Sequence, residues 1–399
     1  MTKTTKAISR RTALAFGSSA LALGLAGMPA QAQQVVKVGL ILPMTGPFAS
    51  TGRQIEAAAK LYMAQKGASV AGKTLELVVK DDTGTPDVTR RIAQELILND
   101  KVSVIAGFGL TPLAMSTAPI ATQAKVPMVV MAAGTSIITD ASPFIARTSF
   151  TQAQSAATMG NWAAKNGVKK VVSLVSDYAP GHDSEKFFAE AFKADGGEVV
   201  QSLRVPLQNP DFAPFLQRVK DVAPDALFVF VPSGVGAVLM KQFIERGLDK
   251  SGIRLIGPGD ITDDDVLNGF GDAAVGTITA HLYSAAHPSA LNKAYVEAFK
   301  KANNNMRPNF MSVGGYDGMH LIYEALKKTN GATDGAGLVE AMKGMAWESP
   351  RGPISIDAAT REIVQNIYIR KVEKVDGELY NVEFATVENV KDPVKAGRK

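Results

Sequence analysis

Short hydrophobic runs recur along this chain, and each is followed by a loop of small and polar residues and then by a segment with helical spacing. The first run lies at 35–42 and its loop at 43–52. The apolar face of the helical segment that follows consists of Ile55, Ala58, Ala59 and Tyr62. Because these positions recur at i, i+3, i+4 and i+7, the stretch predicts a strand, a loop and an amphipathic helix. Thr51 and Gln54 predict a capping box at the start of that helix.

The same unit recurs in two series along the chain. Apolar runs predict strands at 75–80, 102–106 and 126–131 in the first series, and at 170–176, 197–205, 226–231, 253–256 and 275–280 in the second. Strands that alternate with helices are typical of parallel sheets with helices on both faces. A chain of 399 residues with this pattern is therefore predicted to form two α/β domains.

The loops after the predicted strands contain most of the candidate chemistry. In parallel sheets, ligands bind beyond the carboxyl ends of the strands, where the following helices also begin. Helix N-termini present unpaired N–H groups, which suit an anionic group. If the two domains face each other, their loops line one cleft, and we expect a small-molecule site there.

The N-terminal residues 1–32 have the three parts of an export signal. A basic head is followed by small apolar residues at 13–27 and by a small-x-small sequence at 30–32. The apolar run is shorter than the roughly 18 residues that a membrane span needs, which favours cleavage over anchoring. The paired arginines at 10–11 leave both the Sec and the twin-arginine route open.

Charge and cysteine content exclude several kinds of function. The formal net charge is +5, but residues 1–32 hold four basic and no acidic residues, so the rest of the chain is close to neutral. No basic patch is interleaved with aromatic residues, and we do not expect nucleic acid as a partner. The chain has no cysteine, which excludes thiol catalysis, zinc–thiolate sites and disulfides.

The sequence contains no recognisable catalytic constellation. Neither G-x-S-x-G nor a P-loop occurs, and the four histidines lack metal-binding spacing. We therefore predict no enzymatic activity, no catalytic residue, no metal site and no cofactor. Two loop residues remain candidates for binding a ligand: Tyr178 could stack on a ligand or cover the core edge, and Asp260 could face the cleft or be structural.

Several stretches have a distinctive order and spacing. They are KVGLILPMTGPFASTG, DDTGTPDVTRRIAQELI, VSVIAGFG, VPMVVMAAGTS, SDYAPGHDS, IGPGDITDDD with GDAAVG, and GGYDGMHLIYEAL. Together they resemble the periplasmic substrate-binding proteins of ABC importers, specifically the branched-chain amino-acid (Leu/Ile/Val) receptor family, over almost the whole chain after residue 32.

The resemblance implies an α/β, two-lobed, type I periplasmic-binding-protein-like fold with parallel sheets in each lobe. Three interlobe crossings, near 147–154, 280–285 and 353–361, would let the lobes close as a hinge on a ligand. The implied division is a signal peptide at 1–32, a first lobe at 33–147 plus 285–355, a second lobe at 148–284 plus 356–389, and a frayed tail at 390–399.

The resemblance also assigns a ligand site. The ligand carboxylate would be held by N–H and hydroxyl groups of the first lobe, in the loops Gly109, Leu110, Thr111 and Ala133, Gly134, Thr135. Leu110 stands where the family often has serine, and either Gly134 or Thr135 takes the key place. Tyr178 matches the stacking aromatic residue and Asp260 the acidic partner of an ammonium group. Phe48 and Ser233 complete the predicted set.

We therefore expect an exported, periplasmic solute receptor of an ABC importer that captures a small carboxylate, and we favour an amino acid. An aromatic-acid receptor of the same fold is the first alternative. A periplasmic amide hydrolase and a ligand-sensing module are the others. The expected partners are the small carboxylate and a membrane permease, and the protein itself is expected to be a monomer.

Overall fold

The structure of this chain is a computed structural model that describes residues 1–2, 34–396 and 398. The chain divides into an N-terminal unit, Met1–Gln34, and a second unit, Val35–Lys399. All helices and strands given below belong to the second unit. Apart from its first two residues, the predicted signal peptide lies outside the described residues. Within the described part of the chain, no helix is long and apolar enough to cross a membrane.

The first lobe is built on a six-stranded sheet with the order β2-β3-β1-β4-β5-β6. Its strands are β1 (Val35–Leu42), β2 (Ser69–Val70), β3 (Lys73–Asp81), β4 (Val104–Gly107), β5 (Met128–Val130) and β6 (Ile145–Arg147). All neighbours are parallel except β2 and β3. The central strands are buried on both faces, which explains why they read as continuous runs of Val, Ile, Leu and Ala.

The second lobe is built on a nine-stranded sheet with the order β12-β13-β14-β11-β10-β9-β7-β8, in which β15 also pairs with β14. Its strands are β7 (Lys170–Ser176), β8 (Glu198–Val205), β9 (Ala226–Phe230), β10 (Arg254–Pro258), β11 (Ile278–His281), β12 (Ala346–Ser349), β13 (Gly352–Ile356), β14 (Ile363–Val375) and β15 (Glu378–Val390). Strands β7 to β11 are parallel to their neighbours within that group, and β12 to β15 are added antiparallel. The fold is thus the predicted two-lobed α/β architecture with two mainly parallel sheets.

Helices connect the strands and cover the sheets. The α-helices are α1 (Ala49–Lys66), α2 (Pro86–Leu98), α3 (Thr111–Ala124), α4 (Gln152–Lys165), α5 (Ala179–Ala194), α6 (Ala213–Val222), α7 (Ser233–Glu245), α8 (Ala290–Ala302), α9 (Phe310–Lys328) and α10 (Gly335–Met342). Short 3₁₀ helices are η1 (Ile138–Ala141), η2 (Leu248–Lys250), η3 (Gly259–Thr262) and η4 (Leu267–Ala274). Although α8 and α9 follow the second series of strands, they pack against α1 in the first lobe.

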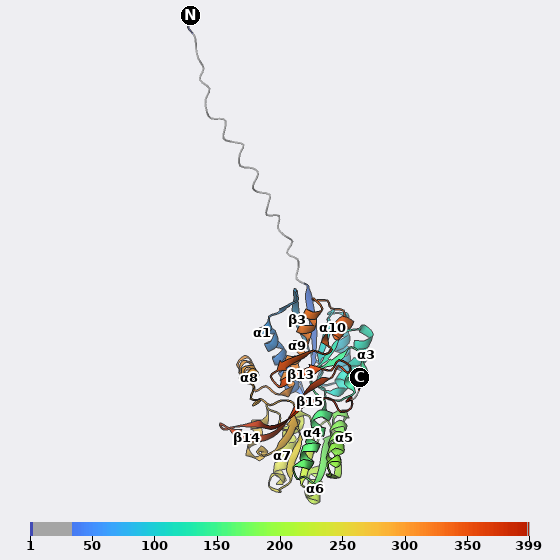
Figure 1. The fold of residues 1–399 in the computed structure, drawn as a ribbon, viewed down its shortest axis with the longest axis vertical. Helices are drawn as coiled ribbons and strands as arrows, with labels where there is room; N and C mark the ends of the chain where they lie inside the picture. Colours follow the sequence, from blue (N-terminus) through green and yellow to red (C-terminus); the bar gives the residue numbers. More distant parts are fainter. Residues whose placement is uncertain (3–33, 397, 399) are drawn as a thin grey trace. The chain divides into compact units, whose positions relative to one another are not determined.

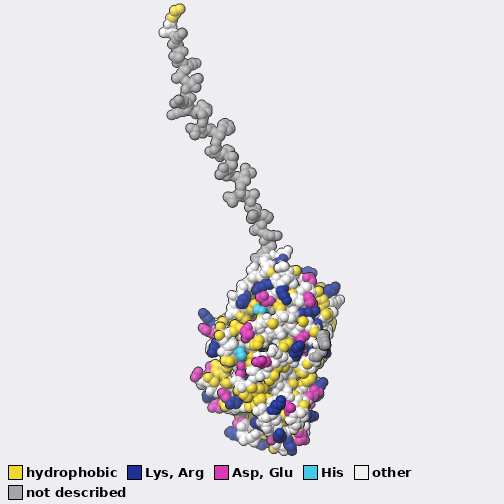
Figure 2. Space-filling view, in the orientation of Figure 1, with side chains coloured by type: hydrophobic (Ala, Val, Ile, Leu, Met, Phe, Trp, Pro, Cys, Tyr) yellow, Lys and Arg dark blue, Asp and Glu magenta, His cyan; other side chains and the backbone are white. Residues whose placement is uncertain are grey.

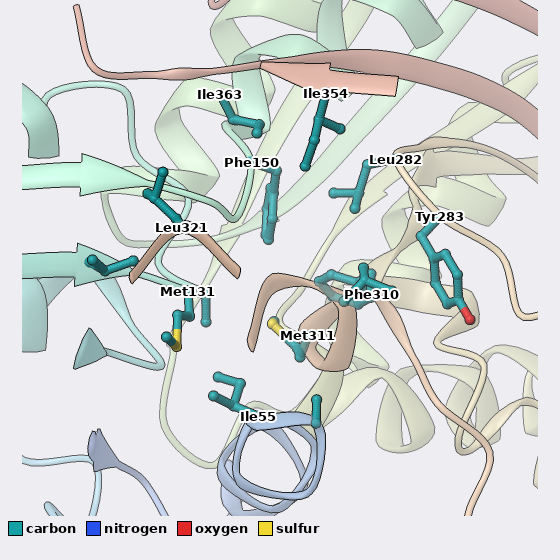
Figure 3. Close-up of a cluster of buried hydrophobic side chains, with 14 of the residues drawn as sticks. Ile55, Met131, Phe150, Leu282, Tyr283, Phe310, Met311, Leu321, Ile354 and Ile363 are labelled. Atoms are coloured by element: carbon teal, nitrogen blue, oxygen red, sulfur yellow. The ribbon is translucent and has the colours of Figure 1, made fainter. Parts of the chain in front are cut away.

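Figure 1 shows the two groups of elements in the second unit: α1, α3, α9 and α10 lie in one half, and α5, α6 and α7 lie in the other. Hydrophobic side chains link the halves. Figure 3 shows Phe150, from the segment between β6 and α4, among side chains from several other elements. These neighbours include Leu282, Phe310, Ile354 and Ile363. The core is therefore continuous through the segments that cross between the lobes.

The distribution of charged side chains on the surface is consistent with a net charge close to zero after residue 32. On the face that Figure 2 shows, lysine and arginine side chains are interspersed with aspartate and glutamate. Neither sign of charge gathers in one large field on that face.

Three local predictions differ from the structure. The first helix begins at Ala49 without the predicted capping box, and Gln54 is instead buried and donates to the carbonyl of Arg307 at 2.9 Å. Strands β12 and β13 are hydrogen-bonded into the second sheet, although we expected residues up to 355 in the first lobe. Within the predicted frayed tail, Asp392 and Lys395 are instead packed against buried partners and are 1% and 4% exposed.

One buried ion pair near a crossing should be essential for stability. Arg351 lies 2.8 Å from Asp317, and their side chains are 0% and 1% exposed. We expect Arg351→Met to lower the free energy of unfolding by about 3–5 kcal/mol, because it leaves a buried carboxylate without its partner. The measurement is urea unfolding followed by circular dichroism.

A matched control is Lys343→Met, which breaks the exposed pair with Glu340 and should cost less than about 1 kcal/mol. Adding Asp317→Asn to Arg351→Met should recover part of the loss, because it removes the unpaired charge. Equal effects of the two single variants would contradict a structural role for the buried pair.

Candidate functional site

A narrow cavity lies where the two lobes meet. Clefts between lobes are common places for small-molecule sites in proteins. Its lining residues from the first lobe include Phe48, Gly109, Leu110, Thr111, Ala133 and Gly134. Those from the second lobe include Tyr178, Phe230, Ser233 and Asp260. Most follow the carboxyl end of a parallel strand, as expected for α/β sheets.

Several helices begin at the cavity. The lining residues in the first turns of α1, α3, α4, α5 and α7 are Thr51, Thr111, Gln152, Pro180 and Ser233. A helix start carries a partial positive charge and N–H groups without an intrahelical partner. At α4, however, the N–H groups of Gln152 and Gln154 are already bonded to the Gly134 carbonyl and the Thr151 hydroxyl. Among the described residues that line it, none is lysine, arginine or histidine. The site can therefore attract an anion through backbone dipoles and hydroxyl groups rather than through a cationic side chain.

The wall from the first lobe is built for hydrogen bonding to an anion. Thr111 is the first residue of α3, and its hydroxyl lies 2.8 Å from the hydroxyl of Thr135. Both side chains are almost fully buried. Thr135 does not line the cavity, and its place is behind Thr111. Because a hydroxyl can both donate and accept, Thr135 can hold the Thr111 hydroxyl in one orientation toward a ligand.

Aromatic rings form much of the remaining surface. Phe48, Phe150, Tyr178 and Phe230 all line the cavity. Tyr178 precedes α5, and its ring is nearly parallel to that of Phe230, with 6.1 Å between the centroids and 15° between the planes. Phe150 stands in the middle of the hydrophobic cluster in Figure 3. Four aromatic rings around one cavity favour a ligand with a planar apolar body.

Asp260 is the acidic residue among the described residues that line the cavity. It lies in η3, is 3% exposed, and accepts a hydrogen bond from the side-chain amide of Gln152 at 3.2 Å. Burial raises the pKa of Asp260 to about 7, and the bond from Gln152 and the positive charge of Arg370 oppose that rise only in part. Its second oxygen can therefore accept a hydrogen bond from a ligand, or the carboxyl can donate one when it is protonated.

The lobes touch each other around the cavity. The hydroxyl of Ser50, in α1, donates to Asp265 of the second lobe, and the N–H of Ser136 donates to Asp183 in α5 at 3.1 Å. Gly234, in α7, approaches the backbone of Pro47 so closely that a Cβ atom there would lie 2.3 Å from the Pro47 carbonyl oxygen. The described arrangement is thus one in which the two lobes are in contact at the rim of the site.

The predicted site residues come together in the structure with one exception. Phe48, Gly109, Leu110, Thr111, Ala133, Gly134, Tyr178, Ser233 and Asp260 all line the same cavity. The exception is Thr135, which supports Thr111 from behind.

Sequence reasoning missed other lining residues. Phe150 and Gln152 lie in the predicted crossing near 147–154, and Phe230 is the last residue of β9. These positions could have been found from the crossing and from the strand-end rule. Met311 follows no strand, since it lies at the start of α9, and no pattern in the sequence indicated it.

Comparisons with known proteins agree with this geometry. A family model described as "Periplasmic binding protein" matches residues 35–378. A similar curated protein is Leu/Ile/Val-binding protein homolog 6 of Brucella melitensis biotype 1, which is 45% identical over 379 residues. That match covers 94% of this chain and 97% of the relative.

Two solved structures are close in both fold and sequence. One is the solute-binding protein of an ABC transporter from Rhodopseudomonas palustris BisB5 in complex with 3,4-dihydroxybenzoic acid, with 68% identity and a TM-score of 0.89 over 90% of this chain and 99% of that chain. The other is a solute-binding protein from Rhodopseudomonas palustris HaA2 in complex with p-hydroxybenzoic acid, with 40% identity and a TM-score of 0.89 over 92% of this chain and 100% of that chain.

The raised pKa of Asp260 predicts a specific dependence of stability on pH. An aspartate in an unfolded chain has a pKa near 3.9, so between about pH 4 and 7 the folded protein holds a proton that the unfolded chain releases. Raising the pH through this window therefore costs stability, by up to about 1.4 kcal/mol per pH unit. We expect ligand-free Asp260→Asn to gain stability relative to the wild type from pH 4 to pH 8, measured by thermal unfolding.

Asp357→Asn is the matched control because the pKa of Asp357 is lowered in the folded protein, whereas that of Asp260 is raised. Hydrogen bonds from Lys391 and Thr360 outweigh burial and lower the pKa of Asp357 to about 2, so its stabilisation is present above about pH 4 and is lost as the pH falls toward 2. Asp357→Asn should therefore lose stability relative to the wild type at neutral pH. Parallel pH profiles of wild type and Asp260→Asn would contradict the proposed state of Asp260.

Proposed function

This chain belongs to the periplasmic binding protein family, whose members are solute-binding proteins and not enzymes. We propose that it is the exported receptor of an ABC importer and that its ligand is a hydroxylated aromatic carboxylate. The observation that carries the proposal is the cavity between the lobes, which combines helix N-termini, aromatic rings and one buried carboxyl group. Family membership sets aside the hypothesis of an amide hydrolase.

The ligand carboxylate would bind at the wall from the first lobe. The start of α3, the Thr111 hydroxyl and the backbone around Gly134 are the donors there. Hydrogen bonds to a charged acceptor are roughly twice as strong as neutral ones, so a few of them hold a carboxylate well. A micromolar receptor needs only about −8 kcal/mol in total, which these bonds and the burial of one ring can supply.

The aromatic body and its hydroxyl group would meet the second lobe. Tyr178 and Phe230 offer their flat faces to a ring, and Asp260 can accept a hydrogen bond from a phenolic hydroxyl. A pKa of Asp260 near 7 also reduces the repulsion between this carboxyl and an anionic ligand, because the group is protonated part of the time at neutral pH. The hydroxybenzoates in the structures of similar proteins support this assignment.

An aliphatic amino acid is the second candidate. The curated relative is called a Leu/Ile/Val-binding protein homolog, and Asp260 could pair with an ammonium group. We favour the aromatic acid because the protein with 3,4-dihydroxybenzoic acid is 68% identical to this chain, against 45% for the curated relative. The aromatic lining of the cavity supports the same choice.

The two candidates can be separated with one variant. We expect 3,4-dihydroxybenzoate and 4-hydroxybenzoate to stabilise the wild-type protein in a thermal-shift screen, since a ligand that binds the folded state raises its stability, and leucine to have no effect. Asp260→Ala should weaken hydroxybenzoate binding by about 10–100-fold, the value of a hydrogen bond of roughly 1.5–3 kcal/mol to a charged group. Calorimetry measures both affinities.

Benzoate is the internal control for that experiment because it has no hydroxyl to lose, and its affinity should change only a few-fold. Binding of leucine by the wild type, abolished in Asp260→Ala, would instead support the amino-acid receptor. A protein stabilised only by uncharged compounds would contradict both carboxylate hypotheses.

Closure of the lobes on the ligand makes a second prediction. Gly234→Ala places a Cβ 2.3 Å from the Pro47 carbonyl, so the lobes can meet only after the backbone shifts. We expect a loss of affinity of at least about tenfold, or 1.4 kcal/mol. Gly236→Ala, in the same helix, is the control because its nearest contact would be an ordinary 3.5 Å. Equal affinities of the two variants would contradict closure against Pro47.

A further inference from the structure

The cavity loop that includes Gly134 is held from behind by one buried arginine. Arg147 donates to the carbonyls of Ala133 and Thr135 at 3.0 and 2.6 Å, and to that of Phe150 at 2.7 Å. Its side chain is fully buried. The N–H and C=O of a trans peptide unit point in opposite directions, so a carbonyl drawn toward Arg147 turns the N–H of the next residue away from it. Ala133 and Gly134 both line the cavity, and we infer that the N–H of Gly134 faces it.

Arg147 is in turn held by a chain of charges that reaches the last residues of the protein. Its Nε lies 2.9 Å from Glu362, and the Nζ of Lys395 lies 2.9 Å from the other oxygen of Glu362. The side chains of Glu362 and Lys395 are 3% and 2% exposed. Lys395 also donates to the hydroxyl of Thr139, which itself donates to Glu362 at 2.7 Å. Removing one partner of a buried ion pair is strongly destabilising, so the position of Glu362 depends on both cations.

The same terminal segment touches the cavity loop directly. Asp392 is 1% exposed and accepts a hydrogen bond from the hydroxyl of Ser136 at 3.0 Å. The carbonyl of Val390, just before the segment, accepts from Gln154 in α4 at 2.8 Å. Arg398 lies 2.9 Å from Asp140. Val390, Asp392 and Arg398 are thus held by partners in α4, in the cavity loop and in η1.

We propose that residues 392–396 are a strap that sets the conformation of the cavity loop 132–136, and that Lys395 is a positioning residue for recognition of the ligand carboxylate. The polar partners of Lys395 among the described residues are Thr139, Asp140 and Glu362, which do not line the cavity, so Lys395 acts through Glu362 and Arg147. Removing its charge leaves Glu362 with Arg147 alone and draws the guanidinium away from the carbonyls of the loop. The consequence for ligand binding rests on the function proposed above.

The test compares Lys395→Met with the wild type in two measurements. Hydrogen–deuterium exchange of the ligand-free protein should be faster in the peptide that covers residues 132–136. The affinity for 4-hydroxybenzoate, measured by calorimetry, should fall about tenfold, within the range of roughly 5–150-fold that is typical of coupling between separate groups. Lys395→Arg keeps the charge and should restore most of both properties.

Lys391→Met is the matched control. Lys391 precedes the strap, its side chain is 57% exposed, and it pairs with Asp357 rather than with Glu362. It should leave both the exchange of the loop and the affinity at wild-type values. Because a general loss of stability would speed exchange throughout the protein, the rate in β9 of the second lobe is the internal reference.

The outcomes separate this proposal from the proposed function. Unchanged exchange of residues 132–136 in Lys395→Met, or faster exchange with unchanged affinity, would overturn the strap. Failure of Lys395→Arg to restore the wild-type values would overturn it as well. If the wild-type protein binds none of the hydroxybenzoates, the proposed function fails, and the exchange of the loop alone then decides whether the strap sets its conformation.

Discussion

Parallel strands place every helix that follows them with its N-terminus at the same edge of the sheet, and the chemistry of this site depends on that constraint. In each lobe the helices after the central strands begin at the shared cavity. The N-terminus of a helix is equivalent to roughly half a positive charge, and its unpaired N–H groups point outward along the axis. An anion can therefore be attracted without a lysine or an arginine among the described lining residues. Such a site also needs no conformational search by long cationic side chains, which lowers the entropic cost of binding.

A site shared by two lobes requires that the segments connecting the lobes keep one conformation. Buried arginines hold these segments by hydrogen bonds. Arg147, Arg351 and Arg370 are the largest of the fully buried side chains. Each donates to backbone carbonyls in or beside a crossing segment: Arg147 to Phe150, Arg351 to Thr148 and Ser149, and Arg370 to Tyr283.

These guanidinium groups are costly to bury, and burial lowers the pKa of both Arg351 and Arg370. The cost is offset by nearby carboxylates, Asp317 for Arg351 and Asp264 for Arg370. Each guanidinium group is planar and has five N–H donors, so it can hydrogen-bond to several carbonyls at once and fix their orientation.

The features of the fold that the sequence predicted share a physical origin. Alternating strands and helices, and the loops with Thr111, Tyr178 and Asp260, follow from local patterns and from the rule that ligands lie beyond strand ends. The features that were missed depend on contacts between distant positions. Gln54 and Arg307 are 253 residues apart, and Thr139 and Lys395 are 256 residues apart. Polar residues near the end of a chain usually indicate solvent exposure, and only the tertiary partners Glu362 and Ser136 reveal that Lys395 and Asp392 are buried.

Asp260 explains how a cavity that attracts anions can also accept a ligand at its acidic wall. A fully ionised carboxylate in this place would oppose the dipoles that recruit the ligand. Burial raises the pKa of Asp260 to about 7, so the negative charge is present only in part at neutral pH. A phenolic hydroxyl that donates to the ionised form, or accepts from the protonated form, satisfies the group in either state. An ammonium group satisfies only the ionised form, and its other donors would need further acceptors in a wall that is largely aromatic. The chemistry of this one carboxyl group therefore favours a hydroxylated ring over an amino acid.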